Sequence, residues 1–305
     1  MNALASIRSD PALEDYLARL ESRLEVALAS HPGILAHAAT ESLAAGGKRL
    51  RPVLTYLTAR PEQRDGEAGL AAGAAVELVH MATLVHDDML DGADLRRGQP
   101  TIWVAYGRET AKAAGDYLFA RAFAELARTG DGVAVSALAA ATLALARGEA
   151  LQRQQAFRSD TSVDDYLRRA SLKTGKLFEA SCVLAGEPRM GRFGMALGIA
   201  FQIADDILDC AGEFDTTGKA PGVDLRDGTP TLPLILAARR DPDVGRALAG
   251  ADIPDALDRV AATGALEESR VVALSYAEQA RNALDGLPDT EALVAVTDAV
   301  VDRQF

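Results

Sequence analysis

Two short acidic segments carry the clearest chemistry in this 305-residue sequence. Each has the form Asp-Asp-x-x-Asp, at residues 87–91 and 205–209, and each follows an apolar run. On a helix, the first and last aspartates of such a segment share one face, about 6 Å apart along the axis. Like charges at this spacing repel, and negative charge near a helix C-terminus is unfavourable. Since no basic residue lies within either segment, the arrangement costs stability locally and indicates a functional role.

Clustered carboxylates of this kind are hard oxygen ligands. Mg²⁺ takes one or two of them, keeps several waters and binds phosphate oxygens alongside. The two cysteines, Cys182 and Cys210, lie in no metal-binding pattern of Cys and His residues. Metals that prefer thiolate or imidazole ligands are therefore disfavoured. A single acidic segment would more often be a solvated face. Two copies favour a Mg²⁺ site that also binds an anionic substrate.

The basic residues point to the same kind of substrate. Five of the 32 basic residues are lysine, and four of these lie in GGKRLRP (46–52), KTGK (173–176) and GKAPG (218–222). Lysine is a compact phosphate-binding charge, and arginine grips phosphate with a planar fork. His80, on the first acidic helix, is a further candidate because an imidazole can donate to a phosphate oxygen. Each signal alone is weak, since basic residues in loops are usually only solvated.

Helices must position all of these residues. Apolar residues recur at three- and four-residue steps, and Ala, Leu, Arg and Glu dominate the periodic segments. Strand-turn-strand patterns are not evident, so the sequence predicts an all-α fold. No low-complexity linker divides the chain, which favours a single domain over residues 1–305. The longest irregular stretch, 210–233, follows the second acidic segment. Irregular loops of this length in a compact protein are usually functional.

Composition limits the partners and the compartment. The formal net charge of −12 argues against nucleic acid or an anionic membrane as the main partner. It does not exclude an anionic substrate, because bound Mg²⁺ inverts the local sign of charge. The longest uncharged stretch, 132–146, is too short to span a bilayer, and the N-terminus shows no signal-peptide pattern. We therefore expect a cytoplasmic protein with no transmembrane segment.

The motifs together resemble the trans-isoprenyl diphosphate synthases, or polyprenyl synthetases. The resemblance runs from residue 46 to about residue 233, and five motifs appear in the family's order: GGKRLRP, ELVHMATLVHDDMLDGADLRRGQPT, KTG, FQIADDILD and GKAPGVDLRDGTPTLP. It implies a single large helical bundle of the isoprenoid synthase type around a central cavity. The implied activity is head-to-tail condensation of an allylic diphosphate with isopentenyl diphosphate. Family members are usually homodimers, which makes a homodimer the expected assembly.

The resemblance also implies roles for particular residues. The Mg²⁺ ligands on the allylic diphosphate would be the six motif aspartates: Asp87, Asp88, Asp91, Asp205, Asp206 and Asp209. Three cations would contact the same diphosphate: Arg96, Lys173 and Lys219. Isopentenyl diphosphate would be bound by Lys48, Arg51, His80 and Arg97. The dipoles of Thr174 and Gln202 would lie near the reacting carbon.

Product length is expected to depend on the helix that carries the first acidic segment. Family members with short products commonly place an aromatic residue four or five positions before the first Asp. Here those positions are Thr83 and Ala82, with Val79 one turn further. None is aromatic, so we expect a product longer than farnesyl diphosphate, of the polyprenyl class. The alternative is a tunnel closed by another helix, which would make the protein a geranylgeranyl diphosphate synthase.

Three other functions fit parts of the sequence. A class I terpene synthase also ionises a diphosphate, but such enzymes usually lack GGKRLRP and this form of the second acidic segment. A non-catalytic, diphosphate-binding subunit of a heteromeric synthase would be expected to lose Asp or Lys residues from these motifs, and none is lost here. A helical scaffold would leave the paired acidic segments unexplained.

Overall fold

The structure is a computed structural model that describes residues 7–211 and 221–302. Helices form nearly all of the regular structure in these residues. Two strands of two residues each, β1 (Leu95–Arg96) and β2 (Gln99–Pro100), pair antiparallel and form the only sheet in this part of the chain. The prediction of an all-α fold is confirmed, and the small hairpin was not expected from the sequence.

Contacts between residues divide the described chain into two compact units. The N-terminal unit contains residues 7–142 and 180–191, and the C-terminal unit contains residues 143–179 and 192–302. Neither unit is continuous in sequence, and α9 (Gly132–Gln155), α11 (Lys176–Val183) and α12 (Met190–Ala211) have residues in both. The single domain over residues 1–305 stays a prediction. The first acidic segment belongs to the N-terminal unit and the second to the C-terminal unit.

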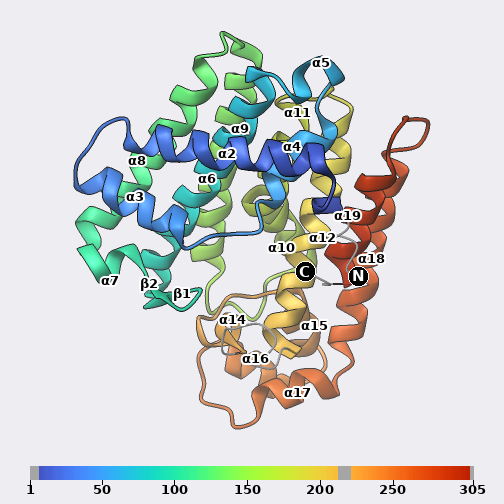
Figure 1. The fold of residues 1–305 in the computed structure, drawn as a ribbon. Helices are drawn as coiled ribbons and strands as arrows, with labels where there is room; N and C mark the ends of the chain where they lie inside the picture. The colour runs from blue at the N-terminus through green and yellow to red at the C-terminus, as the bar shows by residue number, and fades with distance from the viewer. Residues whose placement is uncertain (1–6, 212–220, 303–305) are drawn as a thin grey trace. The chain divides into compact units, whose positions relative to one another are not determined.

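The N-terminal unit is built around one long apolar helix, α6 (Glu67–Asp91). Helix α8 (Arg108–Ala127) packs along it, and α2 (Pro11–Ala29), which crosses α6 in Figure 1, and α4 (Leu50–Thr58) contact it as well. Asp10 caps the N-terminus of α2, because its carboxylate accepts hydrogen bonds from two backbone N–H groups of the first turn. Proline occupies the first helical position. The remaining helices of the unit are α3 (Ile34–Ala44), α5 (Pro61–Arg64) and α7 (Ile102–Tyr106).

Helix α6 ends where the first acidic segment ends. Gly92 follows in the left-handed conformation (φ 67°), and its N–H donates to the carbonyl of Asp88. Glycine is favoured at this position because it has no Cβ to clash. Most of the helix is buried, and its apolar run 71–85 contains two ionisable residues, Glu77 and His80. The aspartates therefore lie in the last turn of a core helix, as the sequence predicted.

The C-terminal unit has its core between α10 (Val163–Ala170), α12, α15 (Leu232–Ala238) and α18 (Ala265–Asn282). Ser162 accepts from the N–H of Asp165 and begins α10, within the stretch 159–165 rich in N-capping residues. A single π-helical turn, η1 (Ser171–Gly175), joins α10 to α11. The other helices of the unit are α14 (Val223–Arg226), α16 (Pro242–Leu248), α17 (Ala256–Ala262) and α19 (Glu291–Asp302).

Two helices among the described residues have the length and composition of a membrane span, α6 and α9. In the most apolar 18-residue window of α6, 78% of the residues are buried, as in the core helix of a soluble protein. In the corresponding window of α9 only 33% of the residues are buried. Val133 and Leu143 of this helix are 81% and 62% exposed. The stretch 132–146, which the sequence analysis judged too short to span a bilayer, thus lies within a helix of 24 residues.

Candidate active site

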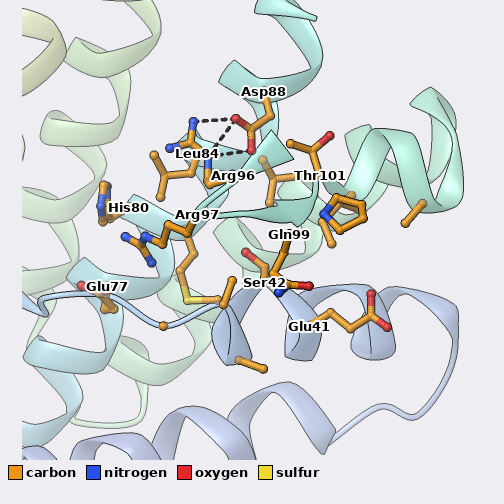
Figure 2. A pocket seen from close by; sticks show the side chains of 18 of the residues that line it. Glu41, Ser42, Glu77, His80, Leu84, Asp88, Arg96, Arg97, Gln99 and Thr101 are labelled. Atoms are coloured by element: carbon orange, nitrogen blue, oxygen red, sulfur yellow. Dashed lines mark hydrogen bonds and ion pairs between the residues drawn. The ribbon is translucent and has the colours of Figure 1, made fainter. Parts of the chain in front are cut away.

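A cavity of about 590 Å³ lies in the N-terminal unit, beside the C-terminal half of α6. Figure 2 shows side chains of α3, α6, the β1–β2 hairpin and the segment after it around this cavity. Helix α6 contributes Glu77, His80, Leu84 and Asp88, which follow one another at steps of three and four residues. This spacing places all four on one face of the helix. One face of α6 therefore supplies a buried acid, an imidazole and a motif aspartate to one cavity.

The hairpin aims two arginines at the cavity. Its turn consists of Arg97 and Gly98, which both have positive φ (53° and 76°), as the tight turns of two-residue hairpins require. The guanidinium of Arg96 donates to both carboxylate oxygens of Asp88, with N···O distances of 2.5–2.8 Å. Asp88 is buried. The middle aspartate of the first motif is therefore engaged by the arginine that was predicted to bind diphosphate.

The GGKRLRP segment forms the turn into α4. Gly46 (φ 76°) and Arg49 (φ 49°) are both left-handed, and the buried Arg49 donates to Glu77 at 2.9 Å. Arg51 follows on α4, and burial lowers its pKa to about 10, although the charge of Glu77 opposes this shift. Lys48 is exposed and is not among the residues that line the cavity.

His80 lies among these cations. Burial and the charges of Arg51, Arg96 and Arg97 hold the pKa of the imidazole well below its ordinary value of 6.5. The ring is therefore neutral at physiological pH and carries one N–H donor. Burial and the charge of Arg96 also lower the pKa of Arg97. The cavity concentrates positive charge on arginines, with a neutral imidazole between them, and this arrangement suits a diphosphate.

The three aspartates of the second motif have different surroundings on α12. Asp205 is exposed. Asp206 is buried and accepts hydrogen bonds from the hydroxyl of Tyr166 at 2.6 Å and from the amide of Gln202 at 2.8 Å. Burial raises the pKa of Asp206 to about 7, although both hydrogen bonds lower it. The carboxylate of Asp209 accepts from two backbone N–H groups at the start of α14, at 3.2 and 3.0 Å.

The KTG motif lies on the π-helical turn η1, a type of irregularity that is frequent at functional sites. Lys173 donates to Glu149 at 2.6 Å and to Gln152 at 3.2 Å. Thr174 donates to the side-chain oxygen of Gln202 at 2.5 Å. Since Gln202 in turn donates to Asp206, a chain of hydrogen bonds joins the KTG motif to the second acidic motif. Both motifs belong to the C-terminal unit.

Other predicted site residues lie apart from these clusters. In the first motif, Asp87 is half-buried and Asp91 is exposed, and neither lines the cavity. The three residues predicted to control product length, Val79, Ala82 and Thr83, also do not line it; Val79 and Ala82 are fully buried. Lys219 lies outside the described residues.

Sequence reasoning missed several residues of these clusters. The signal for Glu77 was present, because it is the one acidic residue in the apolar run 71–85. Arg49 was noted only as part of its motif. Tyr166 carried no signal, since its contact with Asp206 spans 40 residues of sequence. Asp224, whose pKa is raised well above 3.8 by burial and by the charges of Asp206 and Asp209, lies in the irregular stretch that was expected to be functional.

The donor set suits a hard divalent cation that shares its coordination with a substrate. The carboxylates of Asp91 and Asp205 are exposed. Carboxylate oxygens are the ligands that such cations accept. Across residues 7–211 and 221–302, no three Asp, Glu, His or Cys side chains form a ready cage for a metal.

An all-α fold, an arginine-rich cavity and two helices with paired aspartates near their ends suit the binding of anionic, diphosphate-type ligands. A family model described as "Polyprenyl synthetase" matches residues 32–253. The chain belongs to the polyprenyl synthetase family.

Similar proteins cover nearly the whole chain. The heptaprenyl diphosphate synthase component 2 of Geobacillus stearothermophilus is 42% identical over 296 residues, which are 92% of each protein. The nonaprenyl diphosphate synthase of Mycobacterium tuberculosis is 36% identical over 96% of this chain and 93% of that protein. A crystal structure of a polyprenyl synthase from Caulobacter crescentus, complexed with calcium and isoprenyl diphosphate, has a TM-score of 0.90. It is 35% identical and covers 99% of this chain and 98% of that one.

Proposed function

We propose that the protein condenses an allylic diphosphate head to tail with isopentenyl diphosphate and makes an all-trans polyprenyl diphosphate. As a polyprenyl synthetase, it is a prenyl-transferring enzyme. The observation that carries the proposal is the cavity where His80, Arg96 and Arg97 meet, directly beside the first aspartate motif. An arginine-lined site next to carboxylates at a helix end suits two diphosphates, one bound by side-chain cations and one bound with metal.

The roles of the residues follow from their charges and positions. We assign isopentenyl diphosphate to three cations of the cavity and its surroundings, Lys48, Arg51 and Arg97, and to the neutral imidazole of His80 as an N–H donor. Lys173, held by Glu149 and Gln152, neutralises charge on the allylic diphosphate, and Thr174 and Gln202 direct their dipoles at the carbon that becomes cationic. Fixed charges of this kind stabilise a leaving group as its charge develops. The isopentenyl double bond then attacks the cation, and the released diphosphate takes up the proton that the product cation loses.

We infer that the metal is Mg²⁺ and that, among the six motif aspartates, Asp87, Asp91 and Asp205 are its principal ligands. The metal, when bound, neutralises charge on the diphosphate. Asp88, Asp206 and Asp209 make the hydrogen bonds described above and hold these helix ends in shape. Support comes from the carboxylate donor set and from the calcium bound in the similar Caulobacter protein. Mg²⁺ should raise the thermal unfolding temperature in the presence of pyrophosphate, and the Asp205→Ala variant should lose this shift.

Pyrophosphate release distinguishes condensation from simple ionisation. The purified protein should release pyrophosphate only when farnesyl diphosphate, isopentenyl diphosphate and Mg²⁺ are all present. Release from farnesyl diphosphate alone would instead indicate a terpene synthase. No release under any of these conditions would contradict the proposed function.

For product length we propose a chain longer than farnesyl, because the residues before the first motif are not aromatic and the similar proteins are named for heptaprenyl and nonaprenyl products. The floor of the growing chain would lie at Val79, Ala82 and Thr83. The Ala82→Phe variant should therefore make shorter products than the wild type, measured by chromatography of the dephosphorylated alcohols. An unchanged product length in a folded variant would show that the floor is elsewhere.

We propose a cytoplasmic homodimer that uses the exposed apolar face of α9. That face includes Val133 and Leu143, and α9 contains no charged residue before Arg147. The relative named as component 2 of a heptaprenyl synthase favours a second candidate, one chain of a two-component enzyme. Turnover by the purified chain alone would support the homodimer, and turnover only after addition of a second protein would support the two-component enzyme.

A further inference from the structure

A buried ion cluster, formed around Arg49 and Glu77, is part of the wall of the cavity. Arg49 donates to Glu77 on α6 at 2.9 Å and to Glu21 on α2 at 2.6 and 3.1 Å. Its guanidinium also reaches the carbonyl of Leu43, near the end of α3, at 3.5 Å. One side chain therefore ties three helices to the turn that begins α4. None of the residues in these contacts is a proposed diphosphate ligand.

The turn depends on this tie because its backbone is not relaxed. Arg49 has a left-handed backbone (φ 49°), a conformation that costs a non-glycine residue energy and persists only where its surroundings enforce it. Gly47 passes so close to the guanidinium groups of Arg49 and Arg97 that a Cβ there would lie 3.0 and 3.1 Å from their nitrogens. The guanidinium of Arg49 thus packs closely against the chain between Gly46 and Arg51.

Glu77 is also the counter-charge for the neighbouring cations. Its carboxylate, buried like the guanidinium it pairs with, acts favourably on the charges of Arg49, Arg51 and Arg97. Without it, these like charges would repel one another, most strongly around the buried Arg49, and the side chains would move apart. The carboxylate cannot bind a diphosphate itself, because both groups are anions.

We propose that Glu77, acting through Arg49, is a positioning residue that sets the geometry of the isopentenyl diphosphate site. It holds the GGKRLR turn and the arginine cluster in the arrangement that binds a diphosphate. The proposal rests on the proposed function for the identity of the substrate. It predicts a result opposite to that of simple electrostatics, under which removing a negative charge would tighten the binding of an anion.

The test compares Glu77→Gln with a matched control, Glu125→Gln. Glu125 is a buried carboxylate of the same unit that pairs with Arg23 and Arg121 at 2.9 and 3.0 Å and does not line the cavity. Both variants lose a buried ion pair, so both should unfold at lower temperature. Only Glu77→Gln should raise the KM for isopentenyl diphosphate, by about tenfold or more, as expected when hydrogen bonds to charged groups are misplaced. Its kcat and its KM for farnesyl diphosphate should stay within about twofold.

A binding measurement separates this proposal from the proposed function. Calorimetric titration with inorganic pyrophosphate in EDTA reports on the cation site without metal and without turnover. Pyrophosphate should bind Glu77→Gln about tenfold more weakly than wild type. Equal or tighter binding, with a KM like that of Glu125→Gln, would overturn the proposal. If wild type bound pyrophosphate but made no product, the proposed function would fail while this test remained valid.

Two further variants keep the test decisive if Glu77→Gln does not fold. Glu21→Gln removes the half-exposed partner of Arg49, and Arg49→Lys keeps the charge but cannot bridge both carboxylates. Each should raise the KM for isopentenyl diphosphate by a few-fold and leave the KM for farnesyl diphosphate unchanged. Wild-type values in both variants would overturn the proposal as well.

Discussion

Aspartates that look alike in the sequence have unlike surroundings in the structure. Asp205 is exposed, whereas Asp88 is buried against Arg96 and Asp206 is buried against Tyr166 and Gln202. An exposed carboxylate contributes little to stability, but breaking a buried ion pair leaves a charge without its partner. The motif therefore combines residues that face solvent with residues that hold the helix end in place.

This difference predicts how two alanine variants diverge. Asp205→Ala should lose prenyl transfer with an unchanged free energy of unfolding, because its side chain is exposed. Asp88→Ala should lose transfer and also about 1–3 kcal/mol of stability, because Arg96 loses its partner. Urea unfolding and a turnover assay measure both effects. As a control, Glu267→Ala, an exposed carboxylate on α18, should change neither. Full activity in Asp205→Ala would remove that residue from the metal site.

His80 makes stability depend on pH. Its pKa in the folded protein lies well below 6.5, so the unfolded chain binds more protons as the pH falls through that value. Stability is therefore lost toward acid, by up to about 1.4 kcal/mol per pH unit for this one group. Urea unfolding at pH 7.5, 6.5 and 5.5 should show a steeper loss for wild type than for His80→Gln. Parallel curves would mean that folding does not lower the pKa of His80.

Sequence patterns located these residues but not their partners. The acidic segments were predicted to end helices, and the structure places both at the ends of α6 and α12. Tyr166 and Asp206 lie 40 residues apart, and Arg49 and Glu77 lie 28 apart, so no local pattern joins them. Such pairs form only when helices pack against each other. Hydrophobic periodicity identifies the buried face of a helix, but it does not show which other helix that face contacts.

At the scale of elements, close packing positions the KTG motif. A Cβ at Gly148 on α9 would lie 2.6 Å from the backbone nitrogen of Lys173, and one at Gly198 on α12 would lie 2.8 Å from the Cα of Gly175. These glycines let helices approach the π-helical turn more closely than any other residue would. The periodic pattern predicted the helices on either side, but the π-helical turn itself has no signature in the sequence.

We therefore expect a strong effect from one added methyl group. Gly148→Ala should lose about 1–3 kcal/mol of stability, because the backbone of η1 has to move, and its KM for the allylic diphosphate should rise as Lys173 is displaced. Gly132→Ala, at the start of the same helix with nothing within 4 Å of the added atom, is the matched control and should be close to neutral. Equal behaviour of the two variants would show that the contact is not tight in solution.

The hairpin is an element that the sequence did not predict. Its strands have two residues each, too few for any alternation to be recognised, yet its turn places Arg97 at the cavity. Gly98 in the turn was the available clue, since a two-residue loop with glycine second is typical of tight hairpins. Short elements of this kind escape prediction because tertiary contacts, more than intrinsic preference, hold them.

At the scale of the whole molecule, the exposed apolar face of α9 should determine assembly. Leu143→Glu places a charge in the proposed interface and should halve the molar mass measured by light scattering. Leu274→Glu, which changes a leucine 41% exposed on α18, is the control and should keep the wild-type mass. An unchanged mass for Leu143→Glu would show that the interface lies elsewhere. A wild-type protein that is already monomeric would exclude a dimer.

We expect metal-dependent elongation of an allylic diphosphate with isopentenyl units by this chain alone. Its most direct test is the size of the products that the purified protein makes from farnesyl diphosphate and radiolabelled isopentenyl diphosphate. We predict polyprenyl products longer than farnesyl with Mg²⁺, and none with EDTA or in the Asp205→Ala variant. Products that form equally well in EDTA, or no elongation of primers of any length with Mg²⁺, would contradict the account.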